Sequence, residues 1–431
     1  MKRKSTQRGE IMERKLRIGV FGGARGNSMI QVLLNHPEAE LVAVCDRYEP
    51  LLKTASENAR KAGLTIECFT DFERFIEYDM DAVVLANYAT EHATFAIRCL
   101  RAGKHVMSEV LPSETLAQAV ELIETVEETG LVYTYAENYC YMDQTFEMWR
   151  RYREGAIGEV NYAEGEYIHD CAGCWLDITY GDKNHWRNHI YPTFYCTHSL
   201  GPIMTITGRR PVSVVGFENP PIDEFYKLGH AGGHASGIEM VTLDNGAIVK
   251  SIHGPLKLEP AHTDYKVYAT KGYLGTVKEG KKDKVRLYQE GEETCQGENI
   301  VYMPKKFVSA GLAKHSGLTG HGGSDFYPTH FFIQKILGKP EGEWAIDVYQ
   351  AVDMGICGIF AFRSILSGNM PMKIPNFRNR AERDAYRNDH ACTNAAVAGE
   401  QALPCSAYPE KELSEEQARA NRQKWLERHP E

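Results

Sequence analysis

The sequence lacks a long apolar run and an excess of basic residues, and these two absences exclude several classes of protein. Its longest apolar stretches, such as residues 81–89, fall far short of the ~20 residues that a membrane-spanning helix needs. The 431 residues include 49 Lys and Arg against 58 Asp and Glu, a formal net charge of −9, which offers no electrostatic basis for binding nucleic acid or an anionic membrane. We therefore expect a small-molecule partner.

A signal peptide and a disulfide framework are also missing. The basic stretch at residues 1–15 is not followed by the apolar segment that a signal peptide requires. The 11 cysteines are odd in number and scattered from Cys45 to Cys405, and most stand in apolar runs. This is typical of buried thiols in a reducing compartment, so we expect a cytoplasmic protein.

The first third of the chain alternates between strand-like and helix-like segments. Residues 15–22 form a β-branched run that ends in glycine, a helical apolar spacing follows, and residues 39–46 form a second buried-strand pattern ending on Asp46. Further alternation continues to about residue 138. This pattern predicts an α/β fold with an N-terminal, doubly wound parallel sheet of the Rossmann type.

The loop after the first predicted strand indicates a dinucleotide site. Side-chain-free residues let the backbone approach a pyrophosphate, and Asp46, 24 positions after Gly22, is placed to accept the ribose hydroxyls. The G-x-G-x-x-G pattern is incomplete because Ala24 and Asn27 replace its second and third glycines, while Gly23 and Gly26 stand one residue earlier. A plain tight turn is the alternative. Asp46 favours NAD over NADP, although Arg47 leaves NADP open.

The second half of the chain has a different pattern. Alternating strands follow one another from residue 160, and Asp244, Asn245 and Gly246 between two of them indicate a hairpin. We expect three parts: an NAD-binding domain at 13–138, an α+β substrate and oligomerisation domain with an open, mostly antiparallel sheet at 139–376, and a C-terminal arm with a terminal helix at 377–431. Ser414 and Gln417 resemble a capping box at the start of that helix.

Several segments together resemble the Gfo/Idh/MocA family of nicotinamide-dependent sugar enzymes over about residues 13–377. They are IGVFG near the start, the stretch at 83–112, REGAIGEV at 153–160 and the late PMKIPNF. Within that family, residues 164–170, 195–202 and 321–355 are most similar to glycoside hydrolase family 109. The resemblance implies a bound NAD, a carbohydrate or glycoside substrate, and a homo-oligomer, either dimer or tetramer.

The chain departs from the ordinary dehydrogenases of this family in two places. They carry Glu-Lys-Pro after the fifth strand, whereas this chain has Glu109 followed by Val110 and Leu111. They also tend to have an aspartate four residues before the catalytic histidine and another three after it. Around His198 these positions are Phe194 and Gly201. The usual relay for simple alcohol oxidation is therefore absent.

Two Tyr/His pairs are the candidate catalytic groups. Tyr167 and His169 are two apart on a predicted strand and so share one face of the sheet. Tyr195 and His198 are three apart in a segment where Pro192 suits a first helical turn, so they too share a side. Each pair offers a phenol and an imidazole. Ordinary capping or core packing is the alternative for each residue taken singly.

The resemblance implies roles for these groups in a glycoside hydrolysis that passes through transient oxidation at C3, elimination across C1 and C2, water addition and re-reduction by retained NADH. His198 would serve the oxidised hydroxyl, and Tyr167 would remove the C2 proton. His169 and Tyr195 would position the substrate or assist the leaving group. The candidate cofactor residues are Gly22, Gly23, Ala24, Arg25, Gly26, Asp46, Arg47, Asn87, His92, Glu109 and Asn138.

Further candidates surround these pairs. Trp175 and Trp186 have the aromatic character of a sugar platform, although burial is the commoner fate of tryptophan. His321 and Asp325 are placed near the sugar by the resemblance, and the alternative is that Ser324 or Asp325 caps a helix. Cys171 and Cys174 have the spacing of a zinc ligand pair, and only histidines such as His185 and His189 could supply a second pair. We predict no metal, with a zinc site as the alternative.

Three functions compete at this stage. An NAD-retaining glycosidase is favoured. A net NAD-dependent sugar dehydrogenase or keto-sugar oxidoreductase has the same fold and cofactor, and the missing lysine argues against it. A non-catalytic NAD-binding sensor is the remote alternative, and the retention of four candidate proton-transfer groups argues against it.

Overall fold

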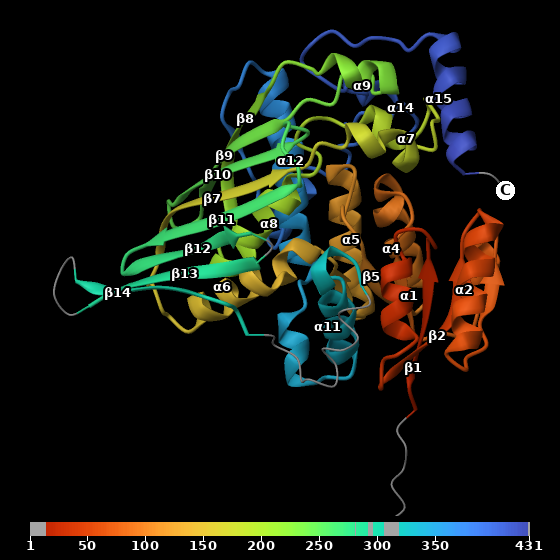
Figure 1. Ribbon diagram of the computed structural model, residues 1–431, viewed down its shortest axis with the longest axis horizontal. Coiled ribbons are helices and arrows are strands. Elements are labelled where there is room, and N and C mark those ends of the chain that lie inside the picture. Colours follow the sequence, from red (N-terminus) through yellow and green to blue (C-terminus); the bar gives the residue numbers. More distant parts are fainter. Residues whose placement is uncertain (1–13, 281, 292–295, 306–318, 430–431) are drawn as a thin grey trace, which may run out of the picture.

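The computed structural model describes residues 14–280, 282–291, 296–305 and 319–429. Residue 13, the expected start of the first domain, lies outside these ranges. Two sheets organise the chain, one formed by the N-terminal third and one by the middle of the sequence (Figure 1). Helices lie between and around them, and buried residues of both parts form one continuous apolar core.

The first sheet has six strands, all parallel, in the order β3-β2-β1-β4-β5-β6. The strands are apolar because helices cover both faces, and β1 and β4 have almost no exposed side chains. This confirms the expected Rossmann-type sheet. Its strands are β1 (Leu16–Phe21), β2 (Ala39–Cys45), β3 (Glu67–Phe69), β4 (Ala82–Leu85), β5 (His105–Ser108) and β6 (Tyr133–Tyr135).

The helices of this layer begin and end at ordinary sequence signals. Thr115 and Gln118 form a complete capping box before α5, and Gly130 ends that helix with a left-handed φ of 63°. The helices are α1 (Asn27–Leu33), α2 (Glu49–Lys61), α3 (Phe72–Ile76), α4 (His92–Arg101) and α5 (Leu116–Thr129).

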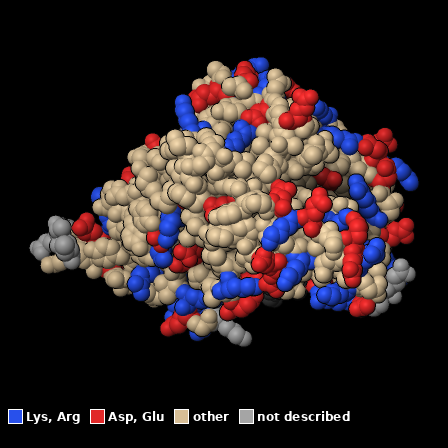
Figure 2. All heavy atoms as spheres, turned by 90° about the horizontal axis from the view of Figure 1, so that it is seen from above, with Lys and Arg blue, Asp and Glu red and all other residues tan. Residues whose placement is uncertain are grey.

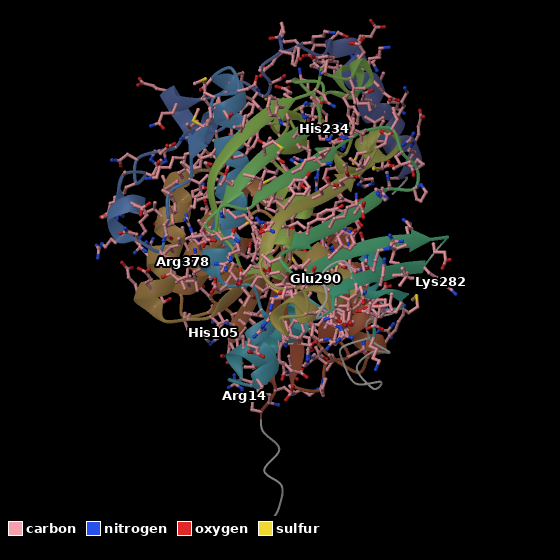
Figure 3. The ribbon with its side chains drawn as sticks, turned by 90° about the vertical axis from the view of Figure 1, so that its left-hand side faces the viewer. Arg14, His105, His234, Lys282, Glu290 and Arg378 are labelled. Carbon is pink, nitrogen blue, oxygen red and sulfur yellow. The ribbon has the colours of Figure 1, made fainter. Side chains whose placement is uncertain are left out.

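The second sheet has nine strands in the order β14-β13-β12-β11-β7-β10-β9-β8-β15. Every neighbouring pair is antiparallel except β10 with β7, which confirms the open, mostly antiparallel sheet. Figure 3 shows its strands reaching the hairpin tip at Lys282. The strands are β7 (Val160–Ile168), β8 (Pro211–Glu218), β9 (Gly237–Leu243), β10 (Ile248–Gly254), β11 (His262–Ala269), β12 (Gly272–Glu279), β13 (Lys282–Glu290), β14 (Gly297–Tyr302) and β15 (Met372–Lys373).

The hairpin expected at Asp244–Gly246 joins β9 to β10, and Gly246 adopts the positive φ of 87° that such a turn needs. Helices α6 (Asp143–Arg153), α8 (Cys196–Thr207) and α12 (Val348–Leu366) cover the inner face of this sheet. The helix expected to start at Pro192 begins later than predicted, because residues 192–195 form turns and α8 starts at Cys196.

Helix α11 (Phe326–Ile336) belongs spatially to the first sheet although it comes late in the chain. It packs on α1, and Phe332 and Ile333 lie in the core beneath that sheet (Figure 1). The segment between the β-rich part and α12 therefore returns to the N-terminal layer. It carries His321 and Asp325 back to the glycine loop.

The C-terminal segment lies against the chain itself. Arg383 is buried and forms an ion pair with Glu127 of α5. The short helices α7 (Trp175–Ile178), α9 (Asp223–Leu228), α13 (Arg380–Asp384) and α14 (Ala395–Ala398) and the final α15 (Glu415–Arg428) complete the fold. Ser414 accepts a hydrogen bond from the Gln417 amide, but the Gln417 side chain binds Asn421, so only half of the expected capping box is formed.

The surface is mixed in charge. On the face shown in Figure 2, Lys and Arg alternate with Asp and Glu around a central area that carries few of either. In the parts of the chain that the structure describes, no helix is both long and apolar enough to cross a bilayer.

Candidate active site

A cavity of about 330 Å³ opens between the two sheets. Its walls come from the loops that follow β1, β4, β5 and β6 and from the end of β7, the start of α8 and the segment at His321. Loops beyond the carboxyl ends of parallel strands are where such folds bind ligands, at the point where the strand order reverses between β1 and β4.

The glycine loop after β1 is shaped by close backbone approaches. Gly22 has a φ of +100°, and a Cβ there would lie 2.4 Å from the backbone of Ala86, which follows β4. A Cβ on Gly26 would lie 2.2 Å from the Gly22 carbonyl oxygen. Ala24 is exposed at the tip of the loop, where a side chain meets no obstacle. Glycine is thus required at Gly22 and Gly26, the first and last positions of this loop.

Asp46 ends β2 beside this loop. One carboxylate oxygen accepts a hydrogen bond from the Gly23 amide at 2.6 Å, and the other accepts one from the Tyr48 amide at 2.8 Å. Asp46 is half-buried and Arg47 is exposed. The carboxylate therefore lies next to the loop that its spacing predicted, held in place by two backbone donors.

Arg25 connects the loop to two buried carboxylates. Its guanidinium lies 2.6 Å from Glu109 and donates to both oxygens of Asp325 at 2.8 and 2.9 Å. Asn138 donates to Asp325 at 2.8 Å, and His321 contacts it at 3.1 Å. Burial alone would raise the pKa of Asp325, but the bonds from Arg25 and His321 outweigh it and hold the pKa well below its usual range.

Two buried polar atoms at the cofactor end of the cavity have no partner within the described residues: Oδ1 of Asn87 and Nε2 of His92. Nδ1 of His92 lies 3.1 Å from the Leu111 carbonyl oxygen, and burial lowers the pKa of His92 to about 4. A neutral imidazole that donates from Nδ1 leaves Nε2 as an acceptor. These orphaned groups and the glycine cradle fit a polar ligand with a pyrophosphate and ribose, so the residues present suit NAD.

The first Tyr/His pair stands at the end of β7. The Tyr167 hydroxyl lies 3.0 Å from Nδ1 of His169, and both side chains line the cavity. Burial raises the pKa of Tyr167 well above its ordinary value, with the Tyr139 phenol and the Cys171 thiol adding to the effect. Burial lowers the pKa of His169. At neutral pH the pair is therefore a protonated phenol next to a neutral imidazole.

The second pair lies at the start of α8. The rings of Tyr195 and His198 stack 5.4 Å apart at 12°, so they share a side although the helix begins later than expected. Arg187 donates to the Tyr195 hydroxyl at 2.5 Å and lies 4.4 Å above the Trp186 ring. Burial raises the pKa of Tyr195, against the opposing charge of Arg187.

His198 has a carboxylate partner that the sequence analysis missed. Glu137, fully buried after β6, lies 2.8 Å from Nδ1 of His198. A carboxylate only accepts hydrogen bonds, so Nδ1 carries the proton and Nε2 is the basic nitrogen. Glu137 precedes Asn138, which was selected, and its place directly after a buried strand was the available signal.

Other groups in the cavity were also missed. The Tyr139 ring packs against His198 at 4.5 Å and Tyr167 at 5.1 Å. On the neighbouring strands, Nε2 of His253 lies 2.8 Å from Glu239, and both are buried. His253 is paired in register with Tyr167, so the two side chains lie side by side on the sheet. His234, labelled in Figure 3, lines the same cavity.

The expected substrate residues separate into two groups. Trp175 is buried, donates to Asn188 at 2.8 Å and packs against Phe225, so although it lines the cavity it is mainly a core residue. Trp186 is half-buried in the cavity wall. His321 lines the cavity, whereas Asp325 is fully buried and makes no capping bond at the start of α11.

Cys171 and Cys174 both line the cavity. Among the described residues, the cluster of at least three side chains close enough to share an ion consists of Glu166, His262 and Asp264 and includes neither cysteine.

Two family models match the chain. Residues 16–137 match an oxidoreductase family with an NAD-binding Rossmann fold, and residues 233–382 match the C-terminal domain of glycosyl hydrolase 109. The N-terminal part of the chain therefore matches the Gfo/Idh/MocA oxidoreductase family. The N-terminal sheet is accordingly the NAD-binding domain of that family, and the C-terminal part is of the glycosyl hydrolase 109 type.

Curated relatives agree with these matches. Proteins named glycosyl hydrolase family 109 from Solibacter usitatus and Akkermansia muciniphila are each 26% identical to this chain; the first is matched over 84% of this chain and 88% of its own length, the second over 84% and 82%.

Solved structures share the fold. Scyllo-inositol dehydrogenase from Lactobacillus casei, solved with NAD(H) and scyllo-inositol, superposes with a TM-score of 0.64 at 17% identity, covering 84% of this chain and 99% of that one. Levoglucosan dehydrogenase, solved with NADH and levoglucosan, superposes with a TM-score of 0.65 at 16% identity, and the match covers 84% of this chain and 100% of that one.

Proposed function

We propose that this chain, whose N-terminal part matches the Gfo/Idh/MocA family, is an NAD-dependent glycosidase. In this proposal the glycoside is oxidised temporarily at C3, loses its C1 substituent by elimination across C1 and C2, gains water and is reduced again. The observation that carries the proposal is that one cavity holds two separate proton-transfer units, with the Tyr167 and His198 rings 4.8 Å apart. Simple alcohol oxidation needs only one such unit, whereas elimination needs a second.

The residues that would hold NAD surround the glycine loop. The backbone of residues 22–26 is open to a pyrophosphate, Asp46 stands beside it for the ribose, and Arg25 is fixed by Glu109 and Asp325. Asn87 and His92 offer acceptor atoms without another partner in the described residues. When bound, NAD supplies a group that accepts a hydride from the sugar and gives it back.

His198 is the base for the sugar hydroxyl in this proposal. Because Glu137 holds the proton on Nδ1, Nε2 is the atom that accepts the hydroxyl proton. The buried carboxylate also stabilises the imidazolium that results. Val110 lines the cavity at the position where family dehydrogenases carry lysine, so an amine does not compete for this proton.

Tyr167 and His169 act as a second unit at C2. The raised pKa of Tyr167 keeps the phenol protonated at rest, so Tyr167 is an effective base only if it passes its proton on. The nearby neutral His169 can take the phenol proton through Nδ1 while the phenol oxygen receives the C2 proton. The later return of these protons provides the acid for water addition.

Tyr195 is placed to assist the leaving group. The Arg187 guanidinium donates to its hydroxyl oxygen, which leaves the phenol proton available to an oxygen in the cavity. The Trp186 ring, which carries the Arg187 guanidinium over one face, forms part of the cavity wall beside the sugar.

The test begins with protein purified without added cofactor, whose absorbance reports retained nicotinamide. A panel of nitrophenyl glycosides is then assayed with and without added NAD. Release of the nitrophenol without accumulation of NADH supports the glycosidase. Stoichiometric formation of NADH with the glycoside intact would instead indicate a net sugar dehydrogenase. If neither nitrophenol nor NADH appears, the non-catalytic sensor is the function that remains.

A further inference from the structure

Two cysteines in the wall of the catalytic cavity form a close pair. Cys171 and Cys174 flank a single helical turn between β7 and α7, and the Cys174 amide donates to the Cys171 carbonyl oxygen at 3.1 Å. Both are half-buried; the Cys174 thiol donates to the Cys171 carbonyl oxygen at 3.5 Å, and the Cys171 thiol donates to the His169 carbonyl oxygen at 3.5 Å. In the described part of the chain the other cysteines are buried, apart from the isolated and exposed Cys68.

The backbone of this turn suits a disulfide. In a 3₁₀ turn, residues three apart eclipse one another with a rise of about 6 Å, which lies within the Cα separation of about 4.4–6.8 Å that disulfides require. The side chains of Cys171 and Cys174 therefore start on the same side of the turn. A Cβ built on Gly173 meets no atom within 4 Å, so the turn has space in which to adjust.

The surroundings favour reaction at Cys174. The hydrogen bond from Cys171 lowers the pKa of Cys174 to about 7, and the positive charge of Arg187 acts in the same direction. The neighbouring Cys174 thiol and burial raise the pKa of Cys171, so Cys171 stays a protonated thiol. A partly ionised thiol next to a protonated one is the arrangement of an attacking and a resolving cysteine.

We propose that Cys171 and Cys174 are a redox-active dithiol that hydrogen peroxide converts into an intramolecular disulfide and that thiol reductants restore. The Cys174 thiolate attacks one peroxide oxygen and the O–O bond breaks. The hydroxide that leaves takes up the proton lost by the Cys174 thiol and becomes water, and Cys174 is left as a sulfenic acid, oxidised by two electrons. The Cys171 sulfur then attacks the Cys174 sulfur, the S–O bond breaks, and a second water takes the Cys171 proton. Two thiols and one peroxide thus give one disulfide and two waters.

The disulfide changes the site because Cys171 is tied to the catalytic strand end. Its Sγ hydrogen-bonds to the His169 carbonyl oxygen at 3.5 Å, and His169 in turn contacts Tyr167. Turning Sγ toward Cys174 removes that bond and moves the sulfur along the cavity wall. Since small displacements of positioned groups lower rates strongly, we expect turnover to fall about tenfold or more in the oxidised protein.

The first experiment does not depend on the reaction that the protein catalyses. The purified chain, with whatever NAD it retains, is treated with hydrogen peroxide, alkylated and digested. The mass of the peptide that contains both cysteines is then measured by mass spectrometry. We expect it to lose about 2 Da, to resist alkylation and to regain both thiols with dithiothreitol. Cys68→Ser, which removes the isolated exposed thiol, should behave in the same way. Two alkylatable thiols at Cys171 and Cys174 after treatment would overturn the proposal.

The second experiment connects the disulfide to turnover, and for this readout alone it rests on the proposed function. Peroxide should lower turnover of the wild type reversibly, while Cys171→Ser and Cys174→Ser each keep their own starting rate after the same treatment. Equal, reversible inhibition of both serine variants would place the sensitive group elsewhere and contradict the expected control of turnover. Failure of every glycoside would contradict the proposed function and leave the result of the mass measurement intact.

Discussion

Nδ1 of His198 lies 2.8 Å from a carboxylate oxygen of Glu137, and the two residues come from different layers of the fold. Glu137 follows the last strand of the NAD-binding sheet, whereas His198 lies in the first turn of the helix that packs on the antiparallel sheet. The base of the proposed reaction is therefore assembled only when both layers are in place. It lies where the cofactor end of the cavity meets the substrate end.

Replacing Glu137 with Gln should lower kcat by about 10² to 10⁴, because an amide can hold the imidazole but no longer fixes the proton on Nδ1 or stabilises the imidazolium. Steady-state kinetics on the best glycoside would measure the loss, and the pH profile of kcat should change as well. Glu147→Gln is the matched control, since Glu147 is also buried and ion-paired but does not line the cavity. Wild-type kcat in the Glu137 variant would contradict the assignment.

Tyr167→Phe should abolish exchange of the C2 hydrogen with deuterated solvent. Without the phenol oxygen, His169 has no group through which to receive that proton. The exchange is followed by NMR or mass spectrometry on recovered substrate. Tyr162→Phe provides the control because it removes a hydroxyl from the same strand outside the cavity. Undiminished exchange in Tyr167→Phe would show that another group is the base.

Much of the fold was predictable from local pattern, since a buried strand, a glycine turn and an amphipathic helix each have a short-range signature. The six parallel strands, the hairpin at Gly246 and the position of Asp46 beside the loop all follow from such signatures. The return of α11 to the first sheet could not be predicted in this way, because apolar residues such as Phe332 and Ile333 give the same sequence pattern whichever core they enter.

The candidate site was predictable in part for the same reason. Tyr167 and His169 were found because two residues on one strand share a face. Glu137 and Arg187 were missed because their partners, His198 and Tyr195, lie 61 and 8 residues away and no periodicity connects them. Trp175 was expected at the sugar, but an aromatic residue in a loop gives no sign of whether it will be buried.

Asp325→Asn should weaken NAD binding about tenfold and change the KM for the glycoside much less. The sequence placed Asp325 near the sugar, whereas the structure buries it behind Arg25 with both oxygens on the guanidinium. An amide loses one of those two charge-assisted bonds and leaves Arg25 less firmly held at the glycine loop. Fluorescence titration of NAD measures the effect.

Asp347→Asn is the control for that titration, because Asp347 caps α12 and does not line the cavity. A variant at Asp325 that binds NAD normally but has a raised KM for the glycoside would restore the sugar-binding role instead.

Glu114→Gln should make the chain more stable at alkaline pH. Burial raises the pKa of Glu114 to about 8 from an ordinary value of 4.5, and one of its oxygens has no partner within the described residues. Between these two values the folded state keeps a proton that the unfolded state has released, so the free energy of unfolding falls as pH rises. The neutral amide removes this loss, and the variant should gain about 2 to 4 kcal/mol on the wild type between pH 5 and pH 8. Urea unfolding at both pH values measures the difference. The control is Glu57→Gln, which changes an exposed glutamate on α2 and should leave the pH dependence of the free energy of unfolding as in the wild type. If Glu114→Gln also kept the wild-type pH dependence, Glu114 would be ionised in the folded chain.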